Sequence, residues 1–157
     1  MAIDKVKKYF KKFNREEDVV EFNESSATVH DAALAIGCCE AHIAKTMSFW
    51  VNEKPILIVL AGDTKVDNSK YKQKFSCKAK MISADELESV IGHAMGGVCP
   101  FAINEGVFVY LDESLKRFSY VYPACGSANS AIKLTIPELE KYSNYKEWID
   151  VGKIKED

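Results

Sequence analysis

Residues 43–60 read IAKTMSFWVNEKPILIVL, two apolar segments joined by a polar turn. In the first segment the apolar side chains at 47, 49 and 51 alternate with those at 46, 48 and 50, the period of a β-strand. Residues 56–60 form an unbroken apolar run, typical of a strand that is covered on both faces. Residues 52–55 supply the turn, so we expect a central β-hairpin around which the chain packs.

The composition is typical of a soluble globular protein with one domain. The chain has 157 residues, of which 47% are apolar and 28% charged, so we expect a single domain spanning residues 1–157. No apolar run approaches the ~20 residues of a membrane span. The lysine-rich N-terminal stretch lacks the apolar core of a secretory signal. These features predict a cytoplasmic protein with no membrane partner.

Net charge and cysteine usage narrow the possible functions. A net charge of −2 excludes a whole-protein basic field for gripping long DNA, although a local site could bind the end of a nucleic acid. Five scattered cysteines indicate reduced thiols. Cys38, Cys39 and His42 lack the usual zinc spacing, so we expect no metal and no cofactor. The lysines of residues 5–12 form either a phosphate-contacting face or a solvated helix face.

Other segments alternate between helix and strand signals. Helices are predicted over residues 3–13, 28–37, 68–75 and 83–91, and a last one after Thr135, with Thr28, Ser83 and Thr135 as caps. Strands are predicted over residues 19–22, 78–82, 107–111, 119–122 and 131–134. This order is not a regular βαβ alternation. We therefore expect an α/β (α+β) protein with a mixed sheet of six or seven strands and helices packed around it.

Residues 92–101, which read GHAMGGVCPF, are the strongest candidate for a functional loop. Gly96 and Gly97 free the backbone, so that successive N–H groups can turn toward one point, and Pro100 then stiffens it. Such a concavity of amides binds an anion or a polarised carbonyl. The alternative is a surface loop that needs glycine to turn. Lys45, at the entry of the hairpin, either points its ammonium group into a cleft beside this loop or covers apolar surface with its stem.

Several short motifs occur together and in order: SSAT (25–28), IAKT (43–46), LAGD (60–63), GGVCPF (96–101), DESL (112–115) and GS (126–127). In this set the chain resembles the YbaK-like aminoacyl-tRNA editing-domain family, over residues 25–139. That family includes the insertion domain of bacterial prolyl-tRNA synthetase and free-standing relatives. The resemblance implies a barrel-like mixed sheet surrounded by helices. It also implies hydrolysis of the ester that joins a wrong amino acid to the 3′ acceptor end of tRNA, with an aminoacyl-tRNA synthetase as a possible partner.

The family's functional positions carry over onto particular residues here. Lys45 matches the lysine of the I-x-K-T motif, and Gly96 and Pro100 match the ends of the G-x-x-x-P loop. Residues 126–130 match a turn where some relatives place a histidine or an aspartate, and this chain has neither there. The predicted catalytic residues are Lys45, Gly96 and Gly97. The predicted substrate-binding residues are Thr46, Asp63, His93, Pro100, Ser127 and Asn129.

An aminoacyl ester is an activated acyl group, so positioning and oxyanion stabilisation suffice. The amides of Gly96 and Gly97 suit the oxyanion, and Lys45 can hold a phosphate or the ribose. No side-chain base is obvious, and the family implies help from the substrate's own ribose hydroxyl. Gly97→Ala is then expected to be folded but nearly inactive. Two alternatives remain: a cysteine hydrolase using Cys99 with His93, and a non-catalytic module that binds a tRNA end or a synthetase.

Overall fold

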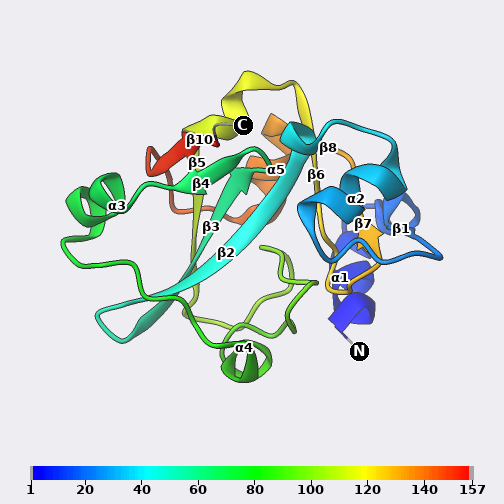
Figure 1. The fold of residues 1–157 in the computed structure, drawn as a ribbon. Helices are drawn as coiled ribbons and strands as arrows, with labels where there is room; N and C mark the ends of the chain where they lie inside the picture. Colours follow the sequence, from blue (N-terminus) through cyan, green and yellow to red (C-terminus); the bar gives the residue numbers. More distant parts are fainter. Residues whose placement is uncertain (1, 156–157) are drawn as a thin grey trace.

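A long antiparallel hairpin forms the centre of the protein (Figure 1), whose computed structural model describes residues 2–155. Strand β2 (Ile43–Val51) pairs with β3 (Lys54–Ala61), from Val51 opposite Lys54 at the turn to Ala44 opposite Ala61 at the far end. Asn52 and Glu53 make the turn with φ of 49° and 66°, the pair of positive φ angles that suits a two-residue hairpin loop. The predicted central hairpin is confirmed.

Four further strands extend this hairpin into a mixed sheet with the order β8-β6-β2-β3-β5-β9. They are β5 (Phe108–Asp112), β6 (Tyr120–Pro123), β8 (Leu134–Thr135) and β9 (Glu147–Ile149). The pairs β2–β6, β3–β5 and β5–β9 are parallel, whereas β6–β8 is antiparallel. Two small antiparallel pairs stand apart: β1 (Val20–Glu21) with β7 (Ser130–Ala131), and β4 (Thr64–Val66) with β10 (Gly152–Ile154).

Apolar side chains cover both faces of the central strand β3. Leu57, Val59 and Ala61 belong to one core with Phe10, whereas the alternate residues of β3 belong to a second core with Tyr71. This arrangement explains the unbroken apolar run of residues 56–60. The helices around the sheet are α1 (Ala2–Lys11), α2 (Val29–Ile36), α3 (Asn68–Phe75), α4 (Ala84–Val90) and α5 (Ile136–Ser143), with short 3-10 turns η1 (Glu16–Asp18), η2 (Glu40–His42) and η3 (Glu113–Arg117). The predicted mixed, barrel-like α+β fold is confirmed.

A buried carboxylate fixes the segment before β10 against the sheet. Asp112, at the end of β5, is 1% exposed. One of its oxygens accepts hydrogen bonds from the backbone N–H groups of Val151 and Gly152, at 2.9 and 3.1 Å, and the other accepts from the N–H of Ser114 at 3.0 Å. β10 is thereby held beside β4, at the end of the hairpin where Lys45 lies.

The structure departs from the sequence prediction in several elements. Residues 78–82 form only a single bridge, between Phe49 and Met81, rather than a strand. The predicted strand 131–134 is divided because the chain changes partner within it: β7 pairs with β1, and β8 then pairs with β6. Strands β4, β9 and β10 were not predicted. Across residues 2–155, no helix has the length and apolarity needed to cross a membrane.

Candidate functional site

The edge of β2 that faces away from β3 pairs with two separate segments, and a gap lies between them. β6 pairs with its first two residues only. Farther along, the N–H of Trp50 donates to the carbonyl of Lys80 at 2.8 Å, and the N–H of Ile82 donates to the carbonyl of Ser48 at 3.1 Å. Alternate residues of a strand direct their backbone polar groups to the same side. The N–H and C=O of Thr46 therefore point into the gap.

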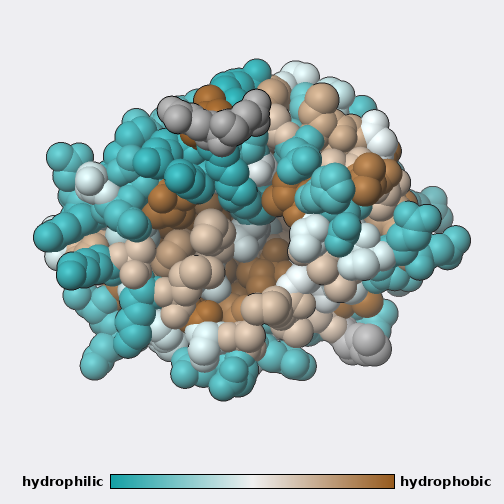
Figure 2. Space-filling model, viewed as in Figure 1, coloured by the Kyte–Doolittle hydropathy of each residue, from teal (hydrophilic) through white to brown (hydrophobic). Residues whose placement is uncertain are grey.

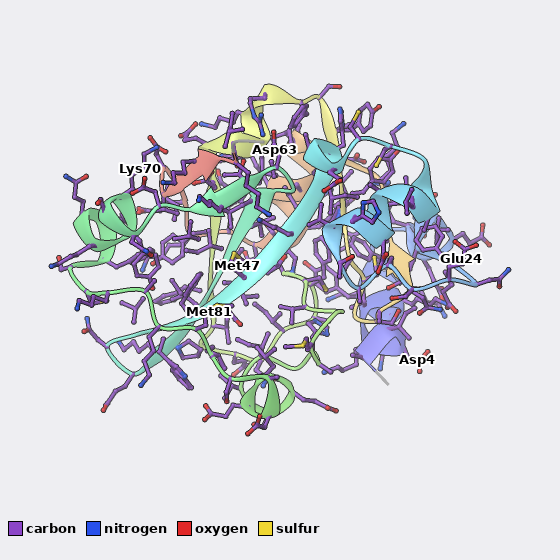
Figure 3. All side chains as sticks on the ribbon, in the orientation of Figure 1. Asp4, Glu24, Met47, Asp63, Lys70 and Met81 are labelled. Atoms are coloured by element: carbon purple, nitrogen blue, oxygen red, sulfur yellow. The ribbon has the colours of Figure 1, made fainter. Side chains whose placement is uncertain are left out.

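A cavity of about 220 Å³ lies over this gap. In the space-filling view (Figure 2) it is the central hollow, where apolar residues gather inside a hydrophilic surround. Met47 on β2 and Met81 on the adjoining segment both lie at this hollow (Figure 3). Small apolar residues, methionines and hydroxyls make up most of the lining: Ala27, Ala32, Ala44, Ala124, Ala131, Met47, Met81, Met95, Ser26, Thr46, Ser48 and Ser130.

Two predicted site residues of β2, Lys45 and Thr46, line the cavity. Lys45 is partly buried, and its pKa is lowered to about 8, first by burial and then by the neighbouring ammonium group of Lys155. Asp63 opposes this shift. A lysine with such a pKa is charged through the neutral range and loses its charge at moderately alkaline pH. The side-chain oxygen of Thr46 is buried and has no hydrogen-bond partner among the described residues.

Of the two predicted glycines, Gly96 lies at the cavity and Gly97 does not. Gly96 has a φ of +90°, and a Cβ there would come within 3.2 Å of the Cβ of Ala27. This position therefore requires glycine for its backbone conformation. Within the described residues, no hydrogen bond occupies the N–H of Gly96 or that of Val98, which also lines the cavity.

The role predicted for Gly97 needs correction. Its N–H donates to the carbonyl of Ala94 at 3.1 Å, so this amide is not available to a substrate. A Cβ at Gly97 would lie 2.6 Å from the backbone of Gly126 and Ser127. Glycine is needed here because two loops approach closely. Gly97→Ala would push these loops apart, so the expectation of a folded, inactive variant is also withdrawn.

The turn over residues 126–130 contributes differently from the prediction. The hydroxyl of Ser127 bonds to the side-chain oxygens of Asn129 and Ser130, at 2.9 and 2.8 Å. The amide of Asn129 donates to the carbonyl of Phe22 at 2.8 Å. Ser127 and Asn129 therefore hold the turn in shape and do not line the cavity, whereas Ser130 and Ala131 do.

His93, predicted as a substrate-binding residue, lies in the core. It is 0% exposed, and its Nε2 lies 2.7 Å from the carbonyl of Phe101. A carbonyl oxygen only accepts, so Nε2 carries the hydrogen. The Sγ of Cys99 lies 3.5 Å from this same nitrogen, which therefore cannot take the thiol proton. Burial lowers the pKa of His93 and raises that of Cys99 to about 12.

Together these contacts leave Cys99 a buried thiol without a base or access to substrate, which weighs against the cysteine-hydrolase alternative. Pro100 is also buried and outside the cavity lining, so its contribution is to the loop rather than to a substrate contact.

Asp63, in the turn between β3 and β4, is committed to an ion pair. Its carboxylate accepts hydrogen bonds from both terminal nitrogens of Arg117, at 3.0 and 2.5 Å, and from the hydroxyl of Thr64 at 3.1 Å. The Arg117 guanidinium holds the pKa of Asp63 below its usual range. Asp63 does not line the cavity but acts electrostatically on Lys45.

The sequence did not single out several cavity residues. Ser26 and Ala27 precede α2 and had been interpreted only as part of a motif at the start of a helix, yet both line the cavity. Met81 lies in the segment predicted as a strand and Met95 in the candidate loop, yet neither methionine was singled out. Lys155 follows β10, a strand that was not predicted, so nothing in the sequence indicated that it lies near Lys45.

Comparison with known proteins places this geometry in a family. The sequence profile described as "Aminoacyl-tRNA editing domain" matches residues 23–142. A Bacillus subtilis (strain 168) relative, "Uncharacterized protein YwhH", is 52% identical over 154 residues, with 98% of each chain covered. A proline–tRNA ligase of Streptococcus thermophilus is 24% identical over 130 residues, which are 82% of this chain and 20% of the ligase.

Solved structures agree with the sequence matches. The crystal structure of a candidate trans-editing enzyme for prolyl tRNA synthetase superposes with a TM-score of 0.85 at 25% identity, covering 99% of this chain and 98% of the other. The chain spans only about a fifth of the proline–tRNA ligase it matches, whereas it covers nearly all of the Bacillus subtilis relative. Since the profile match extends over most of the chain, the protein belongs to the aminoacyl-tRNA editing-domain family.

Proposed function

We propose that the protein hydrolyses the ester bond of mischarged aminoacyl-tRNA, as a trans-editing deacylase that serves translation quality control. One observation carries the proposal: Lys45, Thr46 and Gly96, from motifs far apart in the sequence, line a single cavity in a chain of the editing-domain family. The structural neighbour described as a candidate trans-editing enzyme for prolyl tRNA synthetase supports the same assignment.

The cavity suits the acyl part of such a substrate. Its volume of about 220 Å³ corresponds to several waters of ~30 Å³ each, which is room for an amino-acid side chain. Its alanines and methionines offer apolar contact, and the open edge of β2 at Thr46 offers backbone hydrogen bonds. A pocket rejects larger side chains by sterics better than it rejects smaller ones. The substrates we propose are tRNAs charged with small residues such as alanine, serine or cysteine.

Backbone amides supply the oxyanion stabilisation in this proposal. The N–H groups of Gly96 and Val98 have no acceptor among the described residues, and both residues line the cavity. Fixed backbone donors stabilise a developing oxyanion without reorganisation. These two amides replace the Gly96–Gly97 pair that the sequence had suggested.

The chemical step needs only one water. The water oxygen bonds to the ester carbonyl carbon, the bond from that carbon to the ribose oxygen breaks, and the ribose oxygen takes up the proton that the water loses. Among the described residues, no carboxylate or histidine lines the cavity, since His93 is in the core and Asp63 is bound to Arg117. The vicinal ribose hydroxyl of the substrate is the group we assign to relay the proton. Lys45 adds positive charge and holds the acceptor end.

The implied partner is the 3′ acceptor end of a mischarged tRNA, with the tRNA of proline favoured because proline–tRNA ligases match the chain. A synthetase that produces the mischarged tRNA is a second candidate partner. Such a role belongs in the cytoplasm, where tRNA is charged and used.

The proposal is tested by incubating the purified protein with tRNA of proline carrying alanine, serine, cysteine or proline. We expect the protein to release at least one of the three wrong amino acids well above the uncatalysed rate and to leave prolyl-tRNA intact. Binding of the tRNA without release of any amino acid would instead favour the non-catalytic module. If the protein neither binds these tRNAs nor releases an amino acid from them, the proposal is rejected.

A further inference from the structure

Two lysine side chains from distant parts of the chain meet beside the cavity. Lys45 comes from β2, opposite Leu60 in the hairpin. Lys155 follows β10, and its backbone N–H donates to the carbonyl of Asp63 at 2.8 Å. This bond brings Lys155 to the turn after β3, where its charge is close enough to lower the pKa of Lys45.

Across residues 2–155, neither ammonium group has a neutralising partner. Among the described residues, no hydrogen bond or ion pair joins the ammonium group of Lys45 or Lys155 to an acceptor. The nearby carboxylate of Asp63 is already shared by Arg117 and Thr64. Among the described residues, the charged groups that act on Lys45 are therefore Lys155 and Asp63, and Asp63 is itself bound to Arg117 of η3. Like charges at close range repel, and a bound anion would relieve this repulsion.

The lysines of α1 present a contrast. Lys7 forms an ion pair with Glu21, and Lys5 donates to the carbonyl of Gly92 at 3.1 Å. Lys12 lies over the ring of Tyr9. These contacts favour a structural role for that part of the basic face over a phosphate-binding one. The unneutralised pair of Lys45 and Lys155 is the better candidate for an anion.

We propose that Lys155 and Lys45 together form a phosphate-binding site at the mouth of the cavity, which holds a phosphodiester of the tRNA acceptor end. The inference rests on the proposed function for the identity of the ligand. Lys45 belongs to the cavity lining and to the ammonium pair, so an anion held there lies next to the acyl group. A phosphate near the terminal nucleoside satisfies that geometry. Lys155 is a positioning residue in this scheme, since it acts on the acceptor end and on Lys45 rather than on the ester.

The first test compares Lys155→Ala with wild type on whichever mischarged tRNA the wild-type protein hydrolyses. Loss of one charged phosphate contact should raise KM about tenfold with little change in kcat. The dependence of log(kcat/KM) on log[salt] should become shallower by about 0.7, the value for one phosphate of a single strand. Lys155→Arg should keep both properties. Lys65→Ala, which removes an exposed lysine of β4 outside the cavity lining, is the matched control and should behave as wild type.

A second readout does not depend on activity. In protein labelled with ¹³C-lysine, the NMR titration of Lys45 should move to higher pH in Lys155→Ala, because a repelling neighbour has been removed. Adding the RNA trinucleotide CCA to the wild-type protein should also move it to higher pH, because a phosphodiester stabilises the ammonium form.

The outcomes separate the two proposals. If no mischarged tRNA is hydrolysed, the proposed function fails, while the trinucleotide titration still tests the anion site. An unchanged KM, salt dependence and Lys45 titration in Lys155→Ala would overturn the role of Lys155. If inorganic phosphate shifts the Lys45 titration as strongly as CCA at equal concentration, the site takes free phosphate, and the assignment to the acceptor end is wrong.

Discussion

At the scale of single residues, the charge of Lys45 depends on burial and on the neighbouring charged groups. Burial and Lys155 both lower its pKa, to about 8, and Asp63 only partly compensates. The ammonium form therefore prevails below pH 8 and disappears as the pH rises through that value. A free lysine would stay charged to a pH of about 10.

If the ammonium group is required, kcat/KM corrected for spontaneous ester hydrolysis should fall by about tenfold per pH unit above pH 8. Lys45→Arg, whose guanidinium stays charged, should lack this fall at whatever activity it retains. A profile for the wild-type protein that stays level from pH 7 to 9.5 would show that Lys45 acts without its charge.

The buried thiol of Cys99 leads to a second residue-scale prediction. Because its pKa is raised to about 12 and the side chain is 0% exposed, Cys99 should not react with iodoacetamide in the folded protein, whereas the exposed Cys39 should. Cys99→Ala should keep most deacylation. Peptide mapping after alkylation and the variant's activity check this, and an inactive, folded Cys99→Ala would restore the cysteine-hydrolase alternative.

Some predicted site residues lie at the cavity, and their placement depends on the element that carries them. Lys45, Thr46 and Gly96 lie at the cavity because a strand and a glycine turn carry them there. His93 and Asp63 were misassigned because their roles depend on partners distant in space, the carbonyl of Phe101 and the guanidinium of Arg117. A single sequence does not display such partners.

At the scale of elements, helix caps show how a correct pattern can have different outcomes. Thr135 forms a full capping box with Glu138, in which each side chain accepts from the backbone of the other. Ser83 precedes α4 with the same spacing to Glu86, yet its side chain makes no capping hydrogen bond. The pattern was predicted for both helices, and it is confirmed only at α5.

Thr135→Ala should therefore lower the free energy of unfolding by about 1 kcal/mol. Ser83→Ala, the matched substitution at an unused cap, should change it by less than about 0.5 kcal/mol. Urea unfolding of both variants measures the difference. Equal losses would mean that the Ser83 cap forms in solution.

Element length explains which parts of the fold were predictable. The hairpin has nine- and eight-residue strands with clear apolar patterns, and it was predicted. β4, β9 and β10 have three residues each, too few for a period to stand out. Their pairing is decided by the strands they meet, which a single short segment does not reveal.

At the scale of the whole molecule, Asp112 joins the central sheet to the segment that carries Lys155. Asp112→Ala would leave the buried N–H groups of Val151, Gly152 and Ser114 without their acceptor. We expect a loss of about 3 kcal/mol or more in the free energy of unfolding. Asp150→Ala, which removes only an exposed ion pair with Lys70, should cost less than about 1 kcal/mol. Denaturant unfolding distinguishes them, and similar stabilities would mean that Asp112 does not anchor this segment.

The central claim is that the cavity over β2 hydrolyses the ester of mischarged tRNA, and blocking the cavity tests it most directly. Ala27 is exposed and lines the cavity, so Ala27→Trp should fill it without disturbing the core. Leu34→Trp, on the exposed face of the adjoining α2, is the control. The measurement is the rate at which alanine is released from alanyl-tRNA of proline, or the rate for the best substrate among the four charged tRNAs. Ala27→Trp should lower this rate at least about a hundredfold. The control should match wild type. Full activity in a folded Ala27→Trp would contradict the assignment of this cavity as the active site.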